Sequence, residues 1–106
     1  MARIVNITDS EIIFNQGGVI GKQVLRQENT EFVYLSFEPG SETSAHIQEI
    51  LMTFYISNGK GTVIIENETF QLEKGQVIEI PAGKNRQWKN SGSEVLELFV
   101  VKKISQ

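Results

Sequence analysis

Short apolar runs recur along almost the whole chain, and polar residues or turn formers separate them. The runs cover residues 19–26, 32–37, 51–57, 62–66, 69–72, 77–80 and 95–101. Gly, Pro or Asn stands at most of the breaks, as in Pro39-Gly40, Asn58-Gly59 and Lys74-Gly75. No stretch keeps a 3.6-residue period. The pattern therefore predicts an all-β sandwich or barrel built from short strands.

The N-terminal part of the chain is harder to interpret. A first strand is expected near residues 4–8, and residues 15–18 are expected to cover the mouth of the barrel or to form a subunit contact. An all-β domain must protect its sheet edges, and pairing with a second copy is one way to do so. The first strand is therefore predicted to pair outside its own subunit, which gives a homodimer.

Composition limits the classes of function. A chain of 106 residues with 40% hydrophobic residues is expected to form one domain over residues 1–106. The net charge of −3 and the absence of a basic stripe argue against a nucleic-acid partner. The lack of cysteine excludes disulfides and thiolate chemistry. With no apolar run of membrane-spanning or signal-peptide length, we expect a soluble cytoplasmic protein without a membrane partner.

Two stretches, 40–61 and 75–90, carry regularly spaced glycines and chemically versatile side chains. The first contains Gly40, His46, Gln48, Met52 and Gly59, and the second contains Gly75, Pro81, Gly83, Arg86 and Asn90. Side chains alternate between the two faces of a strand. Positions 46 and 48 are therefore expected on one face, as are 52 with 54 and 86 with 88.

This spacing resembles the paired signature of the cupin family. The resemblance implies a single cupin barrel, a double-stranded β-helix or jelly roll, with the signature side chains facing the interior. It also implies a place for a metal, because the family's positions normally supply three histidines and one glutamate. In this chain the four positions hold His46, Gln48, Met52 and Arg86.

These four side chains form a degenerate metal site. His46 is a good ligand, the amide of Gln48 is a weaker one, and the thioether of Met52 suits Cu(I). Arg86 is a permanent cation without a lone pair. At ~4 Å from a divalent ion it would cost roughly 8 kcal/mol even at an effective dielectric of 20. No cofactor is therefore expected; a divalent metal is disfavoured, and would use His46 and Gln48 if it bound.

The leading hypothesis is a barrel that binds a small polar or anionic organic molecule without a metal. Six residues are predicted to form the site: His46, Gln48, Met52, Phe54, Arg86 and Trp88. Arg86 would hold the anion, because a charge inside a barrel needs a partner. The structural alternative is that Arg86 pairs with Glu49 or Glu79, or extends to the barrel mouth.

Two other functions stay open at this point. One is a metal-dependent enzyme of the dioxygenase or isomerase type, using His46 with non-standard ligands. The other is a non-catalytic sensor or structural dimer whose barrel is filled by its own side chains. Whether any reaction is catalysed is also open. His46 is the one side chain with an ordinary pKa near neutrality, so it is the acid–base candidate.

Overall fold

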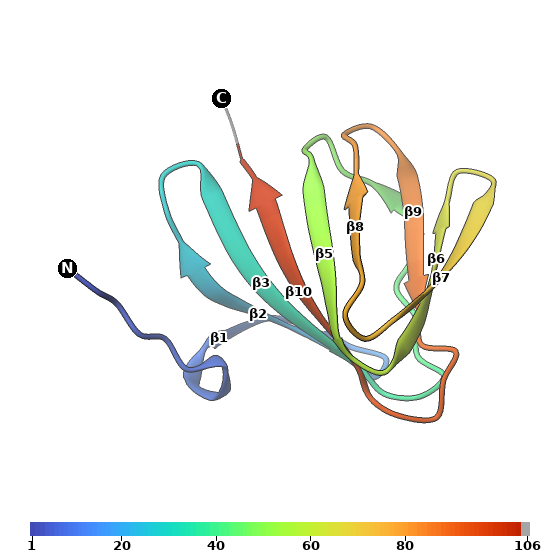
Figure 1. The fold of residues 1–106 in the computed structure, drawn as a ribbon, viewed down its shortest axis with the longest axis horizontal. Helices are drawn as coiled ribbons and strands as arrows, with labels where there is room; N and C mark the ends of the chain where they lie inside the picture. The colour runs from blue at the N-terminus through green and yellow to red at the C-terminus, as the bar shows by residue number, and fades with distance from the viewer. Residues whose placement is uncertain (105–106) are drawn as a thin grey trace.

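Two β-sheets pack against each other to form the molecule, as a computed structural model of residues 1–104 shows (Figure 1). The larger sheet has the order β1-β2-β3-β10-β5-β8 and the smaller has the order β4-β9-β6-β7. The strands are β1 Glu11–Gln16, β2 Val19–Arg26, β3 Thr30–Phe37, β4 His46–Ile47, β5 Met52–Asn58, β6 Lys60–Ile65, β7 Glu68–Glu73, β8 Val77–Ile80, β9 Asn85–Lys89 and β10 Leu96–Lys103. The predicted all-β class is confirmed. The last two positions of the predicted domain lie outside the described residues.

The first strand was predicted at the wrong position. Residues 4–8 do not form a strand; a 3-10 helix, η1, occupies Ile7–Asp9, and the first strand is β1. Asn6 stays extended, and the backbone N–H of Ser10 closes the helix on the carbonyl of Ile7. β1 and β8 are the two edge strands of the larger sheet, and all residues of β1 are exposed. Pairing with a second copy stays a prediction.

All seven of the predicted runs lie in strands, with bounds that differ by three residues or fewer. β4 and β9 were not among them, because their apolar residues are few. The core between the sheets consists of Phe37, Phe54, Ile56, Ile80, Leu96 and Leu98, together with four valines, Met52 and Trp88. No helix in residues 1–104 has the length and apolar character needed to span a membrane.

Two glycines of the signature stretches form turns next to strands of the two sheets: Gly59 lies between β5 and β6, and Gly83 lies just before β9. Gly59 has φ +81° between β5 and β6, and a Cβ there would lie 2.6 Å from the carbonyl oxygen of Val95. Only glycine fits this turn, which carries the chain from the larger sheet to the smaller one. Gly83 has φ +83°, and its N–H donates to the carbonyl of Gln48 at 2.8 Å. It thereby fixes the start of β9 beside one of the predicted site residues.

Tyr34, on the face of the larger sheet that carries Phe99, donates a hydrogen bond to Glu97. Partial burial, that hydrogen bond and the negative charge of Glu97 together raise the pKa of Tyr34 to about 12. An unfolded tyrosine loses its proton near pH 10. Between these two values the unfolded chain binds fewer protons than the folded one, so stability must fall as the pH rises.

We therefore expect the free energy of unfolding of the wild type to decrease more steeply between pH 10 and pH 12 than that of Tyr34→Phe. Urea unfolding at several pH values in this window measures the difference. Tyr55→Phe is the matched control, because Tyr55 is the other tyrosine of the chain and is largely exposed. Equal slopes in the wild type and Tyr34→Phe would contradict the assignment.

Candidate ligand site

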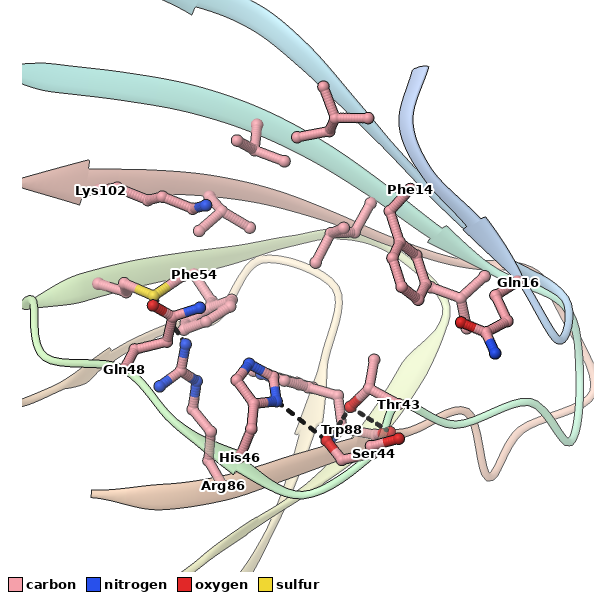
Figure 2. A pocket seen from close by; sticks show the side chains of 16 residues that line it. Phe14, Gln16, Thr43, Ser44, His46, Gln48, Phe54, Arg86, Trp88 and Lys102 are labelled. Atoms are coloured by element: carbon pink, nitrogen blue, oxygen red, sulfur yellow. Dashed lines mark hydrogen bonds between the residues drawn. The ribbon is translucent and has the colours of Figure 1, made fainter. Parts of the chain in front are cut away.

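A cavity of about 290 Å³ lies between the inner faces of the two sheets (Figure 2). One part of its wall comes from the smaller sheet and the loop before it, with Thr43, Ser44, His46 and Arg86. The opposite part comes from the larger sheet and is mostly aliphatic or aromatic. All six predicted site residues line this cavity, as the alternation inferred from the sequence requires, and their role in binding a ligand stays a prediction. Ile47, between His46 and Gln48, points away from it and is 55% exposed.

Hydrogen bonds hold the smaller-sheet side of the wall in place. His46 pairs with Arg86 in the register of β4 and β9. The N–H of Thr43 donates to the carbonyl of Trp88 at 2.9 Å, and the N–H of Trp88 donates to the hydroxyl of Thr43 at 3.1 Å. Because these bonds tie the loop to β9, the side chains of Arg86 and Trp88 have fixed starting points.

Arg86 is the most unusual group of the cavity. Its side chain is only 3% exposed, and its Nη2 donates to the sulfur of Met52 at 2.7 Å. The guanidinium carbon lies 5.8 Å from the centre of the Phe54 ring. A thioether is a weak acceptor and an aromatic face offers only partial compensation. Burial accordingly lowers the pKa of Arg86 from its ordinary value, although an arginine stays charged.

No carboxylate compensates this charge within the described residues. The ion pairs there join Lys89 to Glu42 and Lys102 to Glu31. The alternative in which Arg86 pairs with Glu49 or Glu79 is therefore wrong, because both glutamates are exposed and neither reaches it. The alternative of a side chain extending to solvent also fails on the burial of Arg86.

Trp88 adds a second polar group without a partner. Its ring packs at 5.0 Å from that of Phe54. The indole Nε1 is the only buried side-chain nitrogen or oxygen in residues 1–104 that lacks a hydrogen bond. Buried donors are normally satisfied, so the N–H of this cavity-lining residue is available to an acceptor.

The donor set does not fit a metal. No group of three or more His, Cys, Asp or Glu side chains comes together in the part of the chain that the structure describes. His46 donates from Nδ1 to the carbonyl of Ser44 at 3.0 Å, which leaves Nε2 as its free nitrogen. Met52 already accepts the N–H of Arg86. A cation at these positions would meet one imidazole, one amide and a buried positive charge.

The sequence did not reveal every residue of the wall. Ile13, Phe14 and Gln16 of β1 line the cavity, as do Val33 and Leu35 of β3 and Val100 and Lys102 of β10. Of these, only Gln16 lies in the segment expected near the barrel mouth. Alternation within 32–37 and 95–101 could have shown which residues face inward, but not which of them border a cavity. Asn90, the last position of the second stretch, is buried and fully bonded, so it is structural.

Two packed sheets with a cavity between their inner faces define a small all-β barrel. Residues 33–102, more than half of the chain, match the model of the cupin domain, and the chain belongs to this family. In the curated relative 1-hydroxy-2-naphthoate 1,2-dioxygenase from Nocardioides sp. (strain KP7), 52 residues are 33% identical. They make up 49% of this chain but 13% of that enzyme.

Solved structures agree on the fold. The polyketide cyclase RemF from Streptomyces resistomycificus matches 99% of this chain and 81% of its own, with a TM-score of 0.85 and 17% identity. A predicted oxalate decarboxylase from Thermotoga maritima matches 97% of this chain and 100% of its own, with a TM-score of 0.85 and 22% identity. At these identities the likeness extends to the barrel, and the side chains of the site must be judged on their own chemistry.

Proposed function

We propose that this cupin binds a small organic anion inside its barrel without a metal, and that Arg86 holds the anion. The observation that carries the proposal is the burial of Arg86 beside the cavity with no carboxylate partner in residues 1–104. Removing a charge from water costs several kcal/mol unless a counter-charge compensates it. A bound carboxylate or similar oxyanion would supply both the charge and the planar acceptor that a guanidinium prefers.

The remainder of the cavity supports the same function. The unsatisfied Nε1 of Trp88 is a further donor for a bound acceptor, and the amide of Gln48 is another polar group on the wall. The other walls are largely apolar, which is the usual form of a small-molecule site. The Nocardioides relative is named for an aromatic carboxylate, which is an anion of this general kind.

The two other functions have less support. A metal enzyme would need ligands beyond His46, and the described residues offer no cluster of them. A purely structural module would fill its barrel with its own side chains, whereas this barrel has a cavity. If the bound anion is also transformed, His46 is the acid–base group on the cavity wall.

Trp88 is the only tryptophan, so its fluorescence reports on the cavity. Chelator-treated protein is titrated with benzoate and with benzamide, which have the same shape but different charge. We expect a saturable change with benzoate, at concentrations at least about tenfold lower than with benzamide, because charge-assisted hydrogen bonds are the stronger ones. Tryptophan amide in solution controls for direct quenching.

Adding Mn²⁺, Fe²⁺ or Zn²⁺ back should leave the benzoate curve unchanged. The proposal is contradicted if benzamide binds as tightly as benzoate, or if benzoate binds only after metal is restored.

A further inference from the structure

The inner face of the larger sheet is ordered in rows that differ in polarity. Strand register places Lys102 beside Glu31 on one side and beside Met52 on the other. The next inward row consists of Val33, Val100 and Phe54, and the row after it contains Leu35. Successive rows are two residues apart along a strand, or about 6.7 Å. The wall that the larger sheet contributes therefore changes from charged to apolar along its length, whereas Gln16, Thr43 and Ser44 add uncharged polar groups near the Phe14 end (Figure 2).

The charged end contains the arginine and the lysine that line the cavity, Arg86 and Lys102. Within residues 1–104, Lys102 has a carboxylate partner and Arg86 does not. Arg86 reaches this row through its contact with Met52. Lys102, on the same row, lies 4.0 Å from the carboxylate of Glu31, which also accepts from the amide of Gln23. Because Glu31 already compensates Lys102, the charge balance calls for a ligand with one negative charge rather than two.

The edge strand β1, whose residues are exposed to solvent on one side, lines the apolar end of the wall that the larger sheet contributes. The register of β1 shifts between Ile12 and Phe14, so a bulge lies at Ile13. The shift allows two successive residues, Ile13 and Phe14, to line the cavity instead of alternating. Gly21 lies opposite Phe14, and a Cβ at Gly21 would come within 3.3 Å of the Cβ of Phe14. Figure 2 shows Phe14 at the end of the cavity away from Arg86 and Lys102.

From this arrangement we infer the class of ligand: a monocarboxylate with an extended apolar body whose far end contacts Phe14. The inference rests on the proposed function. A volume of about 290 Å³ corresponds to about ten waters at ~30 Å³ each, and hence to about ten non-hydrogen atoms. Two rows span ~13 Å. Medium-chain fatty acids and arylalkanoic acids have this size and shape.

Four straight-chain probes, three with eight carbons and one with four, separate the parts of this inference. Chelator-treated protein is titrated calorimetrically with octanoate, butanoate, octanedioate and octanamide. Octanoate should bind one per chain and at least about 100-fold more tightly than butanoate, since each buried methylene strengthens binding about fourfold. Octanedioate should bind roughly 30-fold or more weakly than octanoate, because its second carboxylate would lie beside Phe14, where no lysine or arginine of residues 1–104 lines the cavity (Figure 2). Octanamide should also bind more weakly than octanoate, because it carries no negative charge to pair with Arg86.

Phe14→Ala tests the far end of the cavity. Phe14 is 42% exposed, lies on an edge strand and is not part of the buried core, so removal of its ring spares that core. We expect octanoate binding to fall roughly tenfold and butanoate binding to stay unchanged. Ile12→Ala is the matched control, because Ile12 is on the same strand, is 52% exposed and does not line the cavity.

The outcomes distinguish this inference from the proposed function. If neither octanoate nor the benzoate of the fluorescence test binds, the proposed function itself fails. If organic anions bind but octanoate is no tighter than butanoate, or octanedioate equals octanoate, the ligand class is wrong while the anion site stands. If Phe14→Ala and Ile12→Ala change octanoate binding equally, the inference that Phe14 contacts the far end of the ligand is wrong.

Discussion

Arg86→Met is expected to make the protein more stable while removing its capacity to bind organic anions. Methionine has a similar length and would lie among Met52, Phe54 and Trp88, whose side chains are mostly apolar. The substitution removes a buried charge that no carboxylate of residues 1–104 compensates. We expect the free energy of unfolding to rise by about 2 kcal/mol. For a domain of this size the melting temperature should rise by roughly 10 °C.

A stability gain together with a functional loss is characteristic of a residue kept for binding. Arg3→Met is the matched control, because Arg3 is exposed and the change in charge is the same. Its stability should stay within about 0.5 kcal/mol of the wild type. Arg86→Lys keeps the charge and should not be stabilised. If Arg86→Met unfolds more easily than the wild type, Arg86 stabilises the barrel and the account of its charge is wrong.

The combined substitutions Gln48→His, Met52→Glu and Arg86→His are expected to create a metal site. Positions 46, 48, 52 and 86 line one cavity, and the contact of Arg86 with Met52 shows that the last two are adjacent. Three imidazoles and one carboxylate are a common set of ligands for divalent transition metals. We expect Co²⁺ affinity to rise roughly 100-fold or more over the wild type, even without optimised supporting contacts.

The visible spectrum of bound Co²⁺ and calorimetry measure this affinity, and circular dichroism checks that the variant is folded. A control replaces Gln48→His with Ile47→His, because Ile47, the neighbour of Gln48 at the end of β4, is exposed and does not line the cavity. The control should bind clearly more weakly. A folded triple variant without added affinity, or one no better than the control, would show that the four positions do not converge as the cavity suggests.

The fold could be predicted largely from local patterns. Apolar runs bounded by turn residues located the strands that carry many apolar residues, such as 19–26 and 95–101. The pattern failed at β1, where the polar residues Glu11, Asn15 and Gln16 surround an exposed apolar triplet. It also failed at residues 4–8, whose apolar residues suggested a strand although Ile7–Asp9 form a 3-10 helix. An edge strand buries little, so its sequence is weakly constrained.

The site was predictable where it depended on alternation and not where it depended on register. The six predicted residues follow from signature spacing along single strands. Lys102 and Phe14 lie on the wall because β10 and β1 are aligned with β5 and β2 in one particular register. Strand register is a long-range property that one sequence does not display. One sequence also does not show that Arg86 lacks a carboxylate partner, because that depends on where every glutamate lies in the folded chain.

The most direct test of the account compares octanoate binding to the chelator-treated wild type and to Arg86→Met by calorimetry. We predict one saturable site per chain in the wild type and binding weakened roughly 100-fold or more in Arg86→Met, which remains folded. Equal binding by the two proteins, or wild-type binding that appears only when a transition metal is restored, would contradict the claim that Arg86 holds an organic anion without a metal.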